Sequence, residues 1–341
     1  MSPTSLSLCI GQYSDDAYSG FSHIAFNLET MALTSQHNVS GINNPSYLAH
    51  TDRGWYAISE QSQQEGAALY FLRDPFEEVC RQPLEGDHPC HVAISECQTR
   101  LGVAHYGSGS FEVYTLAPTG EIRQRQARFQ NEGQGHHSTR QRGPHGHQIV
   151  FVPQSNQVMT VDLGLDTLNF YQLNKDSVTQ QQTLKLPAGS GPRHAVFSND
   201  GQFGFILCEL DETLGVIEKQ TNGRWQLTSI QPAFPTHSKG EAAGAIKLSS
   251  DQRYIYLSGR HQSIISWFDI TSPNSPNYQG FVETAGSFPR DITLSKDGHW
   301  LVVANQNSNN LVLFSVDKKT GQPTLAKVML TLPKPVCVVF D

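Results

Sequence analysis

The chain has 341 residues, with 24 Lys and Arg against 31 Asp and Glu, which gives a formal net charge of −7. It is 38% hydrophobic and 16% charged, so it has enough apolar material for a large core and is neither a disordered nor a fibrous sequence. Its mild acidity, with no basic run longer than a pair such as Lys318 and Lys319, argues against a nucleic-acid backbone or an anionic membrane as partner.

The N-terminal residues, Met1 to Gly11, contain no basic start and no apolar stretch of secretory length. No segment approaches the run of about 18 apolar residues that a membrane span needs. We therefore expect a soluble, cytoplasmic protein. The six cysteines show no zinc-ligand spacing, and we expect most of them to be reduced core residues: Cys9, Cys80, Cys90, Cys97, Cys208 and Cys337.

The first predicted strands cover Leu6 to Tyr13 and Ser22 to Asn27. A repeat then runs to the end of the chain, with copies roughly 50 residues apart. We count seven copies, which begin at Pro45, Pro89, Pro144, Pro192, Ala243, Pro289 and Pro335.

The clearest copies are Gly191 to Gly201 and Phe288 to Gly298, and each leads into an apolar strand. The Asp-Gly pairs that end these copies lie between two apolar runs, which is a strong hairpin signal. A third strand follows in each unit, and examples are Phe111 to Leu116, Thr167 to Leu173, Ile264 to Asp269 and Asn310 to Val316.

Four short antiparallel strands repeated at this period predict an all-β fold, a seven-bladed β-propeller with little helix. The last copy, Pro335 to Phe340, has room for only one strand, whereas the N-terminus offers strands without a repeat of their own. We therefore expect N- and C-terminal strands to share one blade and to close the ring without free edges. Residues 1–341 are predicted to form a single domain.

In such a blade, the start of strand one, the end of strand two and the start of strand three lie at one edge. Polar residues in these places should therefore meet at the channel mouth. They form a cationic cleft with one carboxylate, which suits a small anionic molecule because arginine binds carboxylate or phosphate in a bidentate manner. The candidates are His145, His147, Arg193, His194, Glu209, Arg260, Arg290, Asn305 and Gln306.

These residues also have a plain structural interpretation, because an Arg or Glu at a blade edge is often only a surface ion pair. The histidines at 136, 137, 145 and 147 suggest a metal, but no carboxylate or cysteine stands nearby at ligand spacing, so we predict neither metal nor cofactor. His136 and His137 are expected to be solvated. The segments Gly107 to Ser110 and Gly189 to Gly191 are predicted loops.

Several ordered motifs resemble the seven-bladed lactonase family, which includes propeller-type 6-phosphogluconolactonases and fungal carboxy-cis,cis-muconate cyclases. The motifs are Pro144-His145-Gly146-His147, Val161-Asp162-Leu163-Gly164-Leu165-Asp166, Gly191-Pro192-Arg193-His194, Cys208-Glu209-Leu210, Ser258-Gly259-Arg260, and Phe288-Pro289-Arg290 with Ala304-Asn305-Gln306. The resemblance implies a catalytic group of His, Arg, Glu and Arg. It falls on His145 or His147, on Arg193, on Glu209 and on Arg260.

Three functions follow from this reasoning. The first is hydrolysis of a sugar lactone, foremost 6-phosphogluconolactone in the pentose phosphate pathway, with Glu209 or a histidine handling the proton and Arg290, His194, Asn305 and Gln306 binding substrate. The second is lactone-forming cyclisation of a carboxymuconate in the same cleft. The third is a non-enzymatic propeller that binds protein, although the sequence lacks the Trp-Asp repeat signature and predicts no obligate protein partner.

Overall fold

The computed structural model describes residues 4–15, 18–175 and 177–341. The chain separates into two compact units, residues 49–232 and residues 1–48 together with 233–341. The first boundary falls inside strand β4 (Leu48–Thr51). That residues 1–341 fold as one domain stays a prediction.

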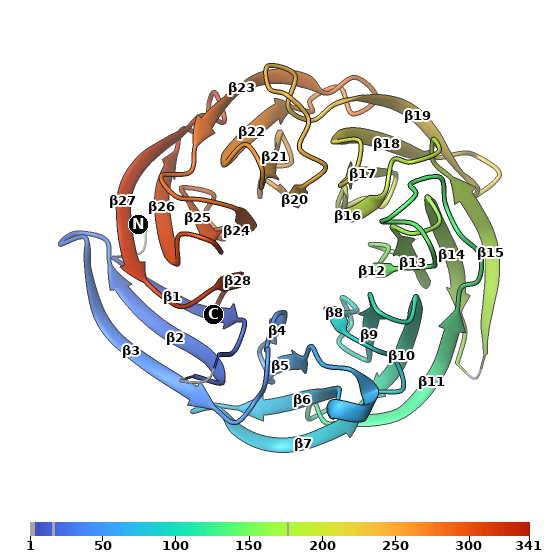
Figure 1. The fold of residues 1–341 in the computed structure, drawn as a ribbon, viewed down its shortest axis with the longest axis horizontal. Helices are drawn as coiled ribbons and strands as arrows, with labels where there is room; N and C mark the ends of the chain where they lie inside the picture. Colours follow the sequence, from blue (N-terminus) through green and yellow to red (C-terminus); the bar gives the residue numbers. More distant parts are fainter. Residues whose placement is uncertain (1–3, 16–17, 176) are drawn as a thin grey trace. The chain divides into compact units, whose positions relative to one another are not determined.

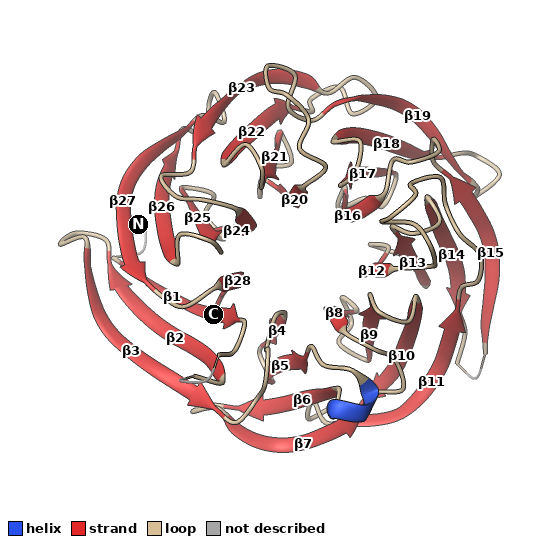
Figure 2. Ribbon diagram, in the orientation of Figure 1, coloured by secondary structure: helices blue, strands red, loops and turns tan. Residues whose placement is uncertain are grey.

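The described chain is all-β, with 28 strands in seven four-stranded antiparallel sheets. A single short 3₁₀ turn, η1 (Gln63–Glu65), is the one helical element in these residues (Figure 2). This is the strand organisation of a seven-bladed β-propeller, so the predicted fold class, blade number and low helix content are confirmed.

Residues 49–232 hold four of the sheets, and each sheet follows chain order from its first strand to its fourth. The first sheet contains β4, β5 (Gly54–Ser59), β6 (Ala68–Arg73) and β7 (Glu77–Pro83), and the second β8 (Pro89–Ile94), β9 (Arg100–His105), β10 (Ser110–Leu116) and β11 (Ile122–Gln130). The third contains β12 (Gly146–Phe151), β13 (Gln157–Asp162), β14 (Thr167–Leu173) and β15 (Val178–Lys185), and the fourth β16 (Pro192–Phe197), β17 (Phe203–Cys208), β18 (Thr213–Lys219) and β19 (Trp225–Pro232).

The other unit holds three sheets, one of which combines both ends of the chain. In that sheet β28 (Pro335–Phe340) pairs with β1 (Ser5–Gln12), followed by β2 (Gly20–Asn27) and β3 (Ala32–Ser40), as Figure 1 shows. The predicted sharing of a blade by the termini is confirmed. The remaining sheets are β20 (Ala243–Leu248), β21 (Tyr254–Gly259), β22 (Ile264–Asp269) and β23 (Asn277–Glu283), and then β24 (Pro289–Leu294), β25 (Trp300–Asn305), β26 (Asn310–Val316) and β27 (Pro323–Thr331).

Burial within a blade explains why its strands differ in composition. The second strand β21 is buried at every position, whereas the fourth strand β23 alternates between exposed and half-buried residues. A strand covered on both faces needs a continuous apolar run, and an outer strand with one wet face needs alternation. Sheets pack face to face inside each unit. One such core joins β12–β15 to β16–β19, where the rings of Phe170 and Trp225 stack with centroids 5.3 Å apart.

The first strand of several blades carries a bulge at its second residue. Pro192 pairs with Cys208 and His194 pairs with Leu207, so Arg193 has no opposite residue on β17. The same break in register falls at Cys90, at His147 and at Arg290. Because a bulge turns a side chain away from the regular pleat, it is a common device next to active sites.

In most blades the residue after the second strand is fixed to the start of the blade by one recurrent hydrogen bond. Its backbone N–H donates to the carbonyl of the residue that precedes strand one, at 2.6 to 3.0 Å in the five blades that follow. The bonds are Tyr106 to His88 at 2.9 Å, Leu163 to His145 at 2.9 Å, Glu209 to Gly191 at 2.6 Å, Arg260 to Ala242 at 3.0 Å and Gln306 to Phe288 at 3.0 Å. This bond places the residue after strand two at the same blade edge as the bulge.

A buried histidine in the second blade has consequences for acid stability. His105 ends β9, is fully buried, and lies with Nε2 3.6 Å from a carboxylate oxygen of Glu112. That separation is too long for a hydrogen bond. Burial, followed by the charge of Arg128, lowers the pKa of His105 to about 3, so this contact involves a neutral imidazole.

We predict that His105 makes the protein acid-sensitive. Between about pH 6.5, the ordinary pKa of histidine, and pH 3, the unfolded chain binds a proton that the folded chain does not. The free energy of unfolding should therefore fall as the pH falls, by on the order of 1 kcal/mol per pH unit from this residue. Denaturant titrations from pH 7 to 4 should show a flatter dependence for His105→Gln. The variant His136→Gln, which changes an exposed histidine, should keep the wild-type slope, and equal slopes for all three proteins would contradict the prediction.

Candidate functional site

The site in residues 49–232 is built around the carboxylate of Glu209, which follows β17 and is buried. Nε of Arg193 lies 3.1 Å from Oε2, and Nη2 of Arg140 lies 2.5 Å from Oε1. Nε2 of His147 lies 3.9 Å from Oε2, which is too far for a hydrogen bond but close enough for an electrostatic contact. The single carboxylate of the predicted cleft is thus surrounded by two guanidinium groups and an imidazole.

Two of these three partners are bulge residues. Arg193 occupies the bulge of β16 and His147 the bulge of β12, so neighbouring blades present equivalent positions to Glu209. Sequence analysis singled out Arg193, His147 and Glu209 together, and the structure brings these three together.

The two histidines of the Pro144-His145-Gly146-His147 motif have different surroundings. His145 precedes β12, its Nδ1 lies 2.8 Å from the carbonyl of Tyr106, and its ring stacks on the Tyr106 ring at a centroid distance of 4.4 Å. Its backbone N–H donates to Oδ1 of Asp162 at 2.9 Å. His145 thus faces Tyr106, whereas His147 faces Glu209, which selects His147 as the candidate proton carrier.

Arg140 and Tyr106 are functional candidates that sequence reasoning missed. Nη2 of Arg140 lies 3.4 Å from the hydroxyl of Tyr106, whose ring also meets the His147 ring edge-on. Burial lowers the pKa of the Arg140 guanidinium, but the charge and hydrogen bond of Glu209 outweigh burial and raise it, so Arg140 stays protonated. Tyr106 could have been found, because it follows strand two as Glu209 does. Nothing local marks Arg140.

Arg140 belongs to a loop that is held in place by Gln141 and Asp166. The buried Gln141 side chain donates to Oδ1 of Asp166 at 2.7 Å and to the carbonyl of Leu163 at 2.8 Å, and accepts from the N–H of His137 at 2.8 Å. The ring of His137 in turn accepts the N–H of Arg140 at 3.2 Å. His137 is therefore half-buried and organises the loop, while His136 is exposed as expected.

His194 lies one residue beyond the bulge and is buried. Its Nδ1 lies 3.2 Å from Nη1 of Arg193, and its ring meets the rings of His147 and His91 edge-on at centroid distances of 5.2 and 5.5 Å. In this place His194 contacts the side chains that surround Glu209. A substrate-binding role for it stays a prediction.

The unit of residues 1–48 and 233–341 carries the other candidates. Arg260 follows β21, is buried, donates from Nε to the carbonyl of Ala242 at 3.2 Å and lies over the Phe288 ring. Arg290 occupies the bulge of β24 and donates to the hydroxyl of Tyr13 at 2.7 Å.

Two amide candidates follow β25 or end it. Asn305 is fully buried and donates to the carbonyl of Thr284 at 3.2 Å, so its side chain holds the end of β25 against the end of β23. Gln306 directly follows the strand, in the place that Glu209 and Arg260 take in their own blades.

Within residues 4–15, 18–175 and 177–341, no group of three or more His, Cys, Asp or Glu side chains could hold a metal ion. No helix in those ranges is long and apolar enough to cross a membrane. All six cysteines are free, and four of them, Cys9, Cys90, Cys208 and Cys337, are buried, as predicted.

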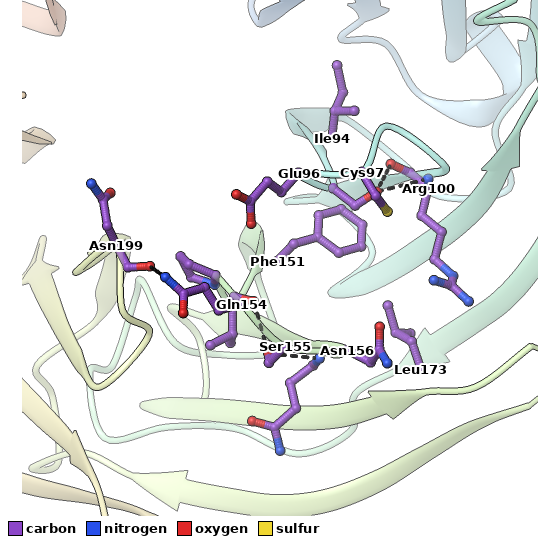
Figure 3. A pocket seen from close by; sticks show the side chains of 14 residues that line it. Ile94, Glu96, Cys97, Arg100, Phe151, Gln154, Ser155, Asn156, Leu173 and Asn199 are labelled. Carbon is purple, nitrogen blue, oxygen red and sulfur yellow. Dashed lines mark hydrogen bonds between the residues drawn. The ribbon is translucent and has the colours of Figure 1, made fainter. Parts of the chain in front are cut away.

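A cavity of about 830 Å³ opens in the second and third blades of residues 49–232, at the blade edge opposite the bulges. Figure 3 shows Cys97 and Arg100 on one side of it, and Gln154 bonded to the carbonyl of Asn199 on the other. Its walls come mainly from the turns between first and second strands, residues 95–97 and 152–156, and from strand residues beside these turns. It therefore lies away from the bulges and from Glu209, and we assign it no part in the chemistry.

Together, the fold and the buried carboxylate among arginines and a histidine define a β-propeller with a candidate active site. The chain belongs to the seven-bladed β-propeller lactonase family, whose model matches residues 7–340. This membership points to a hydrolase acting on a small lactone.

Individual relatives agree with the family. The chain is 30% identical to a 6-phosphogluconolactonase of Bacillus subtilis, over 97% of both chains. It resembles the crystal structure of a putative 6-phosphogluconolactonase from Bacteroides uniformis, with a TM-score of 0.89, 26% identity, and coverage of 99% of this chain and 100% of that one. A Pseudomonas aeruginosa periplasmic gluconolactonase, at a TM-score of 0.87 and 24% identity over 98% and 99% of the two chains, shows the same fold.

Proposed function

We propose that the protein hydrolyses a sugar lactone, and that its substrate is 6-phosphogluconolactone, which it opens to 6-phosphogluconate for the pentose phosphate pathway. The observation that carries the proposal is the buried Glu209 carboxylate, held by Arg193 and Arg140 with His147 beside it. The Bacillus subtilis relative supports the choice of the phosphorylated lactone.

Lactone hydrolysis needs a water molecule delivered to the ring carbonyl and a stabilised oxyanion. The water oxygen bonds to the carbonyl carbon and loses a proton, the ring C–O bond breaks, and the departing ring oxygen takes up a proton. In our proposal Glu209 and His147 accept the proton of water and return it to the ring oxygen. No covalent intermediate is required.

The arginines supply positive charge where negative charge develops. Arg193 is the proposed partner of the oxyanion, because its guanidinium is already fixed against Glu209 and needs no reorganisation. We propose Arg260 as a second catalytic arginine, and Arg290, His194 and Gln306 as substrate contacts. For Asn305 we propose a positioning role, since its amide is buried and bonded to Thr284.

A substrate panel tests the proposed function. Freshly generated 6-phosphogluconolactone, glucono-1,5-lactone and a carboxymuconate would be incubated with the protein, and the lactone rates corrected for spontaneous opening. We expect the phosphorylated lactone to give the highest kcat/KM. Turnover of the carboxymuconate without lactone hydrolysis would replace the proposal by a lactone-forming cyclase, and turnover of none would refute hydrolysis of these lactones.

The part played by Arg260 is tested by comparing the two ends of one strand. Arg260 follows β21 and Arg253 directly precedes it, so the two arginines lie at opposite edges of the same blade. Arg260→Ala should lower kcat/KM for the lactone by about 10²-fold, the scale of losing one stabilising donor. Arg253→Ala should stay near wild type. Equal activity of both variants would remove Arg260 from the proposed machinery.

A further inference from the structure

Arg140 differs from the other partners of Glu209 in its access to solvent. Its side chain is 36% exposed, whereas the side chains of Arg193 and His147 are 3% and 7% exposed. Of the side chains that contact the carboxylate of Glu209 in these ion pairs, Arg140 is thus the one most open to an incoming molecule.

The guanidinium of Arg140 also has N–H groups that are not used in hydrogen bonds to the described residues. Its side-chain hydrogen bonds to the described residues, with Glu209 and Tyr106, both run through Nη2. The N–H groups of Nε and Nη1 make no hydrogen bond to the described residues and can each donate singly to a ligand. A guanidinium held at one nitrogen still carries its full charge and can donate a charge-assisted hydrogen bond to an oxyanion from another nitrogen.

The loop geometry fixes the backbone from which the Arg140 side chain extends. On one side of Arg140, the ring of His137 accepts its backbone N–H at 3.2 Å; on the other side, Gln141 is buried and bonded to Asp166 and Leu163. The backbone on both sides of Arg140 is therefore anchored before any ligand arrives. Such preorganisation lowers the conformational entropy lost on binding.

We propose that Arg140 is the specificity-determining residue for charged lactones, donating to the substrate's anionic group from Nη1 or Nε while Nη2 remains on Glu209. The inference rests on the proposed lactonase function and adds to it a residue and a recognition step. Charged and uncharged lactones share the reacting ester, so Arg140 separates them by the anionic group alone.

The neighbouring Arg142 provides a matched control within the same loop. It is exposed, and its Nε donates to the carbonyl of Ser138 at 2.9 Å. Removing its charge lowers the net charge of the loop by the same one unit as removing that of Arg140. Of these two arginines, only Arg140 contacts Glu209.

The experiment measures kcat/KM for 6-phosphogluconolactone and for glucono-1,5-lactone with wild type, Arg140→Gln, Arg140→Lys and Arg142→Gln. We divide kcat/KM for the phosphorylated lactone by kcat/KM for the uncharged one. Any loss that acts through Glu209 on both substrates cancels in this ratio. We expect this ratio to fall about 10- to 100-fold in Arg140→Gln, the range of a lost charge-assisted hydrogen bond, with KM for the phosphorylated lactone rising. Arg140→Lys should recover part of the ratio, and Arg142→Gln should keep it.

A binding titration separates this inference from the proposed function. Calorimetry with 6-phosphogluconate and with gluconate should show tighter binding of the phosphorylated acid to wild type, and this preference should be lost in Arg140→Gln. If wild type hydrolyses neither lactone, the proposed function fails, and the titration still decides the role of Arg140. An unchanged preference in Arg140→Gln, by rate ratio or by titration, would overturn the inference.

Discussion

Glu209→Gln is expected to lower kcat/KM for lactone hydrolysis by about 10²- to 10⁴-fold, the usual contribution of a general acid–base group. Glutamine keeps the shape and one carbonyl oxygen but cannot accept a proton from water. The arginine contacts at 3.1 and 2.5 Å should be weakened and not abolished, so the loss should appear mainly in kcat. Single-turnover and steady-state rates on fresh lactone measure it.

The control for this prediction is Glu132→Gln, which removes a carboxylate from an exposed position in the loop that leads to Arg140. It should behave as wild type. Circular dichroism and thermal unfolding of each variant establish that both are folded. Full activity in a folded Glu209→Gln protein would remove the central residue of the proposed mechanism, whereas a similar loss in Glu132→Gln would show that the assay reports general damage.

The blade architecture could be predicted because its determinants are local and repeated. The apolar runs Thr167 to Leu173 and Ile264 to Asp269 coincide with β14 and β22, since each lies between turns that the sequence marks. The shared terminal blade followed from counting strands. These features depend on period and turn chemistry, which neighbouring residues encode.

The register at strand entry could not be predicted in the third repeat. Sequence analysis began that repeat at Pro144, but pairing with Asp162 gives Gly146 the place that Pro192 takes in the next blade. Two residues of offset were enough to leave His145 and His147 undecided. A bulge is a property of two paired strands, so neither strand shows it alone.

Arg140 was missed for a related physical reason. Its loop contains no strand, and its path is set by hydrogen bonds from Gln141 to residues more than twenty positions away in the chain. Composition marks such a segment only as Gly- and His-rich. The residues that the repeat carries could be found from the sequence, whereas those on long connections required the structure.

Asp166→Ala is expected to cost about 2 to 5 kcal/mol in the free energy of unfolding. The buried Asp166 carboxylate accepts hydrogen bonds from the N–H groups of Gly189 at 2.8 Å and Gly191 at 2.7 Å, and from the side chain of Gln141 at 2.7 Å. Alanine would leave the two buried donors, those of Gly191 and Gln141, without this acceptor, at about 1 to 3 kcal/mol for each, whereas the half-buried N–H of Gly189 can turn to water. The backbone of Asp166 is also left-handed, with φ of 56°, which disfavours alanine.

Asp166 also connects the two halves of the proposed site within residues 49–232, since Gln141 adjoins Arg140 and Gly191 precedes the strand of Arg193. Asp166→Ala should therefore lower lactone kcat/KM even well below its unfolding temperature. Asp166→Asn, which keeps one acceptor oxygen and tolerates a left-handed backbone, should restore part of both stability and rate.

The control for this prediction is Asp200→Ala, which removes an exposed turn carboxylate that bonds Gln202 and Ser198. It should cost less than about 1 kcal/mol with no loss of rate. Denaturant titration and lactone kinetics on the four proteins measure both effects. A folded Asp166→Ala with wild-type kcat/KM would show that the loop and the strand entry hold their positions without this carboxylate, because the arginine contacts to Glu209 would then suffice to fix them.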